Sequence, residues 1–92
     1  MTVLAIKKQY FNEILEEKKK FEYRRVCSFY KSRFDNNPKE LMLHYYQKEK
    51  LIVEVLKIEI IKTPEELKNL DIKFGNKIYK IHLGEVLEHI TQ

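Results

Sequence analysis

The sequence has few residues that cross-link a chain or interrupt its secondary structure: it has one cysteine, two glycines and two prolines. The single thiol, Cys27, cannot form an internal disulfide. No stretch approaches the roughly 20 apolar residues of a membrane-spanning helix. The opening residues, MTVLAIKKQYF, contain an apolar run of only four residues and no small-residue cleavage site. These absences predict a cytoplasmic protein with no membrane partner.

The sequence also lacks a metal-binding motif and the length needed for a second domain. Cys27 and the three histidines show no ligand spacing, so we expect no metal site and no cofactor. A chain of 92 residues, of which 43% are hydrophobic, is typical of one globular domain. We therefore predict a single domain over residues 1–92, with no repeat, linker or separate catalytic domain.

The net charge of +4 comes from 18 basic and 14 acidic residues. This balance favours anionic partners but does not identify one. Arginine, which can bind phosphate or carboxylate with two parallel hydrogen bonds, occurs only as Arg24, Arg25 and Arg33. Two of the three lie in the stretch KKFEYRR, residues 19–25, and this concentration makes the stretch a candidate binding element.

Side chains alternate along residues 20–25, which we predict to be a strand. Phe21 and Tyr23 then share one face, which we expect to face the core. Lys20, Glu22 and Arg24 share the other face and would be presented as a group. A simpler interpretation stays open, in which Glu22 and Arg24 form an ion pair of little energetic value on a half-solvated sheet face.

Hydrophobic periodicity predicts strands alternating with two short helices. The strands cover 3–6, 20–25, 40–47, 51–62, 77–83 and 85–90, with Gly84 breaking or bulging the last two, and the helices cover about 8–18 and 64–70. Thr63, Pro64 and Glu66 match a capping box at the second helix. Residues 26–34 are expected to be strand or irregular coil. The order predicts an α+β fold with a small, curled or barrel-like, mostly antiparallel sheet flanked by two short helices.

The predicted strand over 51–62 is apolar on both faces near its start, as in a strand that is covered or curls mid-course. One face is expected to consist of alternate residues: Ile52, Glu54, Leu56, Ile58 and Ile60. A carboxylate among four aliphatic side chains needs a polar partner or a raised pKa. Glu54 is therefore a candidate site residue.

The segment VLAIKKQYFNEILEEKKKFEYRR resembles the opening of ASCH domains, PUA-like β-barrels named for activating signal cointegrator homology. Those domains begin with a strand ending in Ile-Lys-Pro, a helix of the type Tyr-x-x-x-Ile-Leu and a Gly-x-Lys-Thr-x-Glu-x-Arg motif. YKIHLGEVLE and the strand that contains Glu54 resemble the second half of the family. The resemblance implies a PUA-like barrel.

The resemblance also implies a site for RNA or a modified nucleoside between the first helix and the sheet. The residues that match it are Lys7, Lys19, Lys20, Glu22, Arg24 and Glu54. Three positions depart from the family pattern: Lys8 replaces its proline, Glu17 its turn glycine and Lys20 its threonine. The third departure removes a hydroxyl that could orient or attack an acyl group.

Three functions fit these residues. In the first, the cations bind the phosphates of RNA or another single-stranded nucleic acid, and Tyr30, Tyr45 or Tyr46 stacks on a base. In the second, the chain resembles a small amidohydrolase that acts on N4-acylated cytidine derivatives, with Lys19 and Glu54 as catalytic residues. In the third, the fold is a protein-interaction module, for example one from a mobile element. We expect the first.

Overall fold

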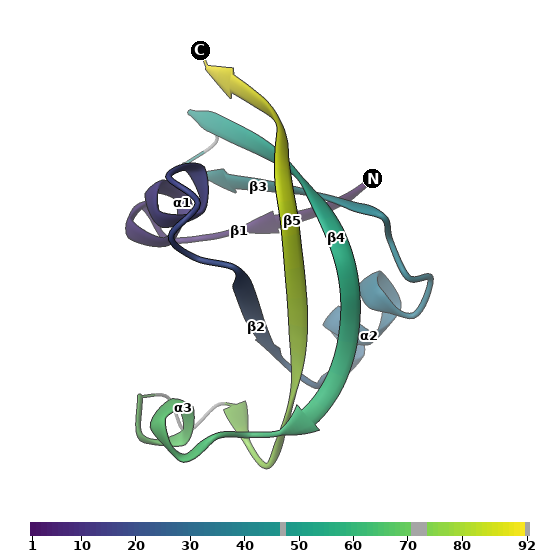
Figure 1. The fold of residues 1–92 in the computed structure, drawn as a ribbon. Helices are drawn as coiled ribbons and strands as arrows, with labels where there is room; N and C mark the ends of the chain where they lie inside the picture. Colours follow the sequence, from purple (N-terminus) through teal and green to yellow (C-terminus); the bar gives the residue numbers. More distant parts are fainter. Residues whose placement is uncertain (47, 71–73, 92) are drawn as a thin grey trace.

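The computed structural model describes residues 1–46, 48–70 and 74–91. Their elements follow in chain order as β1 (Thr2–Ala5), α1 (Lys8–Leu15), β2 (Phe21–Arg25), α2 (Ser28–Phe34), β3 (Glu40–Tyr45), β4 (Glu49–Lys62), α3 (Glu65–Leu70) and β5 (Lys77–Thr91). The fold is α+β, as predicted. Figure 1 shows the long strands β4 and β5 bent along their length, with α1 near one end of the sheet and α3 near the other.

One mixed sheet contains all five strands, in the order β1-β3-β4-β5-β2. Only the pair β1 and β3 is parallel, and the other three pairs are antiparallel. One hydrophobic core lies against the sheet, and α1 contributes Phe11 and Ile14 to it while α2 contributes Phe34. Both helices are therefore anchored to the core by apolar side chains.

The bend in β4 and β5 coincides with irregular pairing in the middle of β4. Val53 lies opposite Val86 but Val55 lies opposite Leu83, so β5 has an extra residue here, in the part that includes Gly84. The expected bulge at Gly84 is confirmed. A Cβ atom at Gly84 would lie 2.2 Å from Oε1 of Glu54, so the missing side chain leaves room for that carboxylate.

The irregular pairing also overturns the predicted face of β4. A further register shift lies between Val55 and Lys57, so the alternation of faces does not run unbroken along the strand. Leu56 is 64% exposed, whereas Ile58 packs against the core. The expectation that Ile52, Glu54, Leu56, Ile58 and Ile60 share one face is therefore wrong.

The sheet is not closed into a barrel: no backbone ladder joins the edge strands β1 and β2 in the described part of the chain. The barrel closure implied by the resemblance is therefore not formed between these strands, and the relation to PUA-like folds stays a prediction. We call the open region between these two edges the seam, defined by Ala5 at the end of β1 and by Glu22–Arg25 in β2. The polar side chains of the seam form the candidate site described below.

Two further expectations are corrected. Residues 28–34 form helix α2, not a strand or coil, and Tyr30 stacks on Phe34 one turn later with ring centroids 5.8 Å apart. The flanking helices therefore number three in the described residues. At α3 the expected capping box is absent, because the buried Oγ1 of Thr63 has no hydrogen-bond partner among the described residues.

Helix α1 ends at Leu15 rather than near Lys18, and its end explains the departure at Glu17. Glu17 has φ of 61°, in the left-handed region that favours glycine. The N–H of Glu17 donates to the carbonyl of Ile14, and the N–H of Lys18 donates to that of Glu13 at 2.8 Å, which is the Schellman arrangement. Glu17 therefore adopts the backbone conformation that glycine usually takes at this position of the turn.

Glu17→Gly is expected to raise the free energy of unfolding by about 1 kcal/mol, because glycine adopts a positive φ without the strain of a side chain. The measurement is urea unfolding followed by circular dichroism. Glu16→Gly is the control, since Glu16 has φ of −83° and gains nothing from glycine. Equal effects of the two substitutions would contradict this explanation.

Candidate functional site

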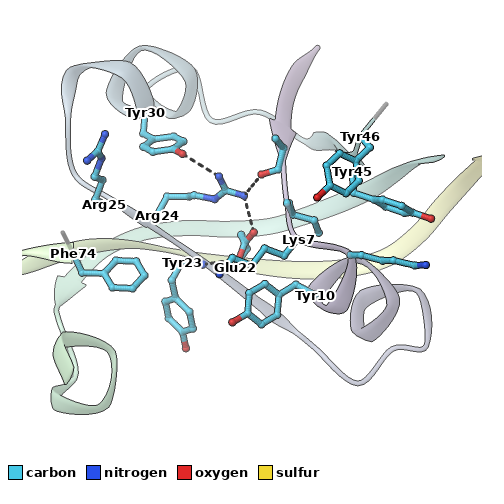
Figure 2. A pocket seen from close by; sticks show the side chains of 13 residues that line it. Lys7, Tyr10, Glu22, Tyr23, Arg24, Arg25, Tyr30, Tyr45, Tyr46 and Phe74 are labelled. Carbon is cyan, nitrogen blue, oxygen red and sulfur yellow. Dashed lines mark hydrogen bonds and ion pairs between the residues drawn. The ribbon is translucent and has the colours of Figure 1, made fainter. Parts of the chain in front are cut away.

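An open pocket of about 730 Å³ lies along the seam, between α1, the edge of β1 and strand β2. Two kinds of side chain dominate its lining. The aromatic ones are Tyr10, Tyr23, Tyr30, Tyr45, Tyr46 and Phe74, and the cationic ones are Lys7, Lys8, Arg24 and Arg25. Figure 2 shows Glu22 and Arg24 in the middle of the pocket, with Tyr30 on one side and Tyr10 and Tyr23 on the other. We call this the seam pocket.

Strand β2 faces the opposite way from our prediction. Glu22 is buried at 6% exposure, whereas Phe21 is 36% exposed and lies beneath Nζ of Lys80, 4.4 Å from its ring centroid. The predicted grouping of Glu22 with Arg24 is right, since they lie opposite Ile81 and Tyr79 of β5, but the third member of the predicted group, Lys20, lines a different pocket. The expectation that the aromatic side chains face the core is wrong, because the polar pair faces inward instead.

Arg24 joins the two edges of the seam through its side chain (Figure 2). Its guanidinium donates to the backbone carbonyl of Ala5 at 2.9 Å, to Oε2 of Glu22 at 2.9 Å and to the hydroxyl of Tyr30 at 3.0 Å. Burial opposes the charge, but Glu22 and Tyr30 outweigh it and raise the pKa of Arg24 above its ordinary value. The side chain replaces part of the missing backbone ladder.

Glu22 likewise forms a hydrogen bond with an edge backbone group, here in β2. Because Leu83 donates its N–H to the carbonyl of Lys20, the antiparallel ladder directs the N–H of Tyr23 away from β5. That N–H donates to Oε1 of Glu22 at 3.2 Å. The two side chains thus satisfy one exposed donor and one exposed acceptor of the seam, which is how edge strands avoid pairing with other chains.

Lys19 lies beside this pair. Its Nζ is 3.7 Å from Oε1 of Glu22 and lies 5.2 Å and 5.7 Å from the ring centroids of Tyr10 and Tyr23. The Lys19 side chain is only 17% exposed. Two cations therefore flank one buried carboxylate, and the cluster carries a net positive charge.

Lys7 and Lys8 stand at the start of α1, where the helix dipole disfavours cations. Lys7 is the N-cap residue and makes no capping hydrogen bond with its side chain. No ion pair of the described residues includes Lys7, Lys8 or Arg25. These three side chains line the seam pocket and form no ion pair with a carboxylate of the described residues, so they are available to an anion.

The six predicted site residues divide between two pockets. Lys7, Glu22 and Arg24 line the seam pocket, and Lys19 contacts its Glu22. Lys20 and Glu54 instead line a second pocket of about 530 Å³ with His82 and Gly84. The pair considered for catalysis, Lys19 and Glu54, is therefore not placed in one cleft.

Sequence reasoning had singled out three of the aromatic residues, Tyr30, Tyr45 and Tyr46, and all three line the seam pocket. It missed Tyr10, Phe74 and Lys8, and it assigned Tyr23 to the core. Tyr10 had a usable signal, because it follows Lys7 by three residues at the start of a helix and so lies on the same side. Strand alternation directs neighbouring side chains to opposite faces, yet Arg25 lines the pocket together with Arg24, from the end of β2.

Within the described ranges, no cluster of three or more histidine, cysteine, aspartate or glutamate side chains could hold a metal ion. No helix there is long and apolar enough to cross a membrane.

At one end of the seam pocket, the hydroxyl of Tyr45 donates to Oε1 of Glu49 at 3.0 Å, and Nε2 of His89 lies 2.7 Å from Oε2 of the same carboxylate. The hydrogen bond with His89, and then that from Tyr45, lowers the pKa of Glu49 below its ordinary value of 4.5. A carboxyl group whose pKa is lower in the folded than in the unfolded protein stabilises the fold at pH values above its unfolded-state pKa. This contribution is lost as the pH falls through the folded-state pKa.

We therefore expect Glu49→Gln to flatten the fall in stability below about pH 4.5, because the amide cannot titrate. The measurement is urea unfolding at several values between about pH 3 and pH 6. Glu65→Gln on α3 is the control and should keep the wild-type slope, since Glu65 is exposed and lies outside this cluster. An unchanged slope in Glu49→Gln would contradict the assignment.

Comparison with known proteins gives no match: no family model, no curated protein and no solved structure is similar to this chain.

Proposed function

We propose that the chain binds RNA or another single-stranded nucleic acid in the seam pocket. The observation that carries the proposal is the combination, in one open pocket, of six aromatic side chains with three cations that form no ion pair among the described residues. Single-stranded nucleic acids are bound by this combination, because cations meet the phosphates and aromatic rings stack on the bases. The resemblance to ASCH domains points in the same direction.

The geometry indicates other phosphate-binding cations than those expected from the sequence. Arg24 is occupied by three partners inside the protein and holds the seam together. Lys7, Lys8 and Arg25 are the exposed cations of the pocket, so we assign the phosphate contacts to them. Tyr10 and Tyr46, which are 38% and 85% exposed, offer ring surface to a base.

The test is fluorescence anisotropy with a labelled single-stranded RNA of mixed sequence, titrated at about 50 mM and about 200 mM salt. We expect binding that weakens steeply with salt. Lys7→Ala and Arg25→Ala should each weaken binding and lower the slope of log K against log salt by about 1. Lys57→Ala is the control, because Lys57 is 63% exposed and lies outside the seam pocket. Absence of binding at the lower salt concentration would refute the proposal.

A further inference from the structure

Among the described residues that line the seam pocket, one is a carboxylate and the other charged side chains are positive. Glu22 is 6% exposed and belongs to the lining of the seam pocket. Its Oε2 accepts from Arg24, and its Oε1 accepts from the N–H of Tyr23 and lies 3.7 Å from Lys19. Because a carboxylate offers about four acceptor positions, Glu22 can accept further hydrogen bonds from a ligand.

A buried carboxylate cannot contact a phosphate without strong repulsion, so the ligand group that reaches Glu22 must present N–H or O–H donors. Among the RNA bases, guanine presents two adjacent donors, N1–H and the N2 amine, on its Watson–Crick edge. Uracil presents one donor between two acceptors, and adenine and cytosine each present an amine next to a ring acceptor. Guanine alone can donate to both oxygens of one carboxylate.

The surroundings of Glu22 match the rest of that edge. In guanine the acceptor O6 lies next to N1–H, and beside the pocket the ammonium of Lys19 lies 3.7 Å from the Glu22 carboxylate. Tyr10 and Tyr23 flank the same cluster, each within 6 Å of Lys19, and their rings provide surface against which a flat base can pack. Acceptors, donor and aromatic surface therefore lie together.

From this arrangement we infer that the seam pocket selects an unstacked guanine, with Glu22 as the residue that reads its Watson–Crick edge. The inference rests on the proposed function and adds base specificity to it. Lys19 contacts O6, and Arg24 holds the Glu22 carboxylate in place.

The test uses uridine heptanucleotides in which the central base is guanine, hypoxanthine, adenine, cytosine or uracil. We expect the guanine-containing RNA to bind between about 5-fold and 150-fold more tightly than all-uridine RNA, the range of one two-bond base contact. The hypoxanthine-containing RNA should bind with intermediate affinity, because it keeps N1–H but lacks the N2 amine.

Glu22→Gln should abolish the preference, since its amide offers one acceptor oxygen instead of two. The matched control is Glu54→Gln in the second pocket, which should keep the preference. Thermal unfolding verifies that both variants are folded. If Glu22→Gln fails to fold, equal binding of the guanine-containing and hypoxanthine-containing RNAs to the wild-type protein would still refute a contact that uses both donors of guanine.

The outcomes separate the two proposals. If no heptanucleotide binds at about 50 mM salt, the proposed function fails and this inference fails with it. If all five bind equally, or cytosine is preferred, nucleic-acid binding stands and guanine selection by Glu22 is refuted. A guanine preference that survives in Glu22→Gln would also refute the role of Glu22.

Discussion

Arg24→Met is expected to lower the free energy of unfolding by about 3–5 kcal/mol, the cost of removing one partner from a buried ion pair. The substitution keeps an apolar side chain of similar length but leaves the 9%-exposed side chain of Glu22 without its closest cation. It also leaves the carbonyl of Ala5 and the hydroxyl of Tyr30 without their donor. Urea unfolding followed by circular dichroism measures the change.

Arg25→Met is the matched control, one residue away in the same strand. Arg25 is exposed, so its substitution should change stability by no more than about 0.5 kcal/mol. The double variant Glu22→Leu with Arg24→Met should recover much of the loss, because it removes the uncompensated buried charge. If Arg24→Met costs no more than Arg25→Met, Arg24 does not hold the seam.

The inverted face of β2 shows what alternation can and cannot predict. A period of two correctly grouped Glu22 with Arg24, but it does not say which of the two groups faces inward. Hydrophobicity favoured the aromatic residues as the inward group. At an open seam the inward side instead has unpaired backbone groups to satisfy, and Glu22 and Arg24 satisfy them. Phe21 lies on the outer face with His82, their ring centroids 5.1 Å apart.

Two other errors have different physical causes. Helix α2 had a signal in the sequence, because Tyr30 and Phe34 are one helical turn apart, but the surrounding aromatic and basic residues obscured it. The position of Glu54 had no comparable signal. Register shifts on both sides of Val55 interrupt the alternation around it, and such irregularities depend on the packing of β4 against β5.

What the sequence predicted well was local and periodic. The β-branched run of β4 and the helix that starts at Lys8 follow from short-range preferences. The seam pocket required something else, because it brings residues of α1, β2, α2 and β3 together. From the sequence, only the resemblance to ASCH domains predicted that Lys7, Glu22 and Arg24 lie in one site.

Phe11→Ala is the second substitution with a large expected effect, a loss of about 3–5 kcal/mol in the free energy of unfolding. The Phe11 ring is fully buried and meets the ring of Tyr45 edge to face, with centroids 4.8 Å apart. It fixes α1 against β3, and α1 in turn supplies Lys8 and Tyr10 to the seam pocket. Chemical denaturation measures the loss of stability.

The neighbouring residue provides the matched control. Tyr10 lies on the same helix but is 38% exposed and lines the seam pocket, so Tyr10→Ala should leave stability nearly unchanged. Under the proposed function it should weaken RNA binding by about 5-fold to 150-fold, the value of one stacked base. If Tyr10→Ala left affinity unchanged, Tyr10 would not be a stacking residue. If Tyr10→Ala destabilised the fold as much as Phe11→Ala, the role of Tyr10 would be structural. The comparison is informative because the two residues are adjacent on one helix but face different surroundings, the core for Phe11 and the seam pocket for Tyr10.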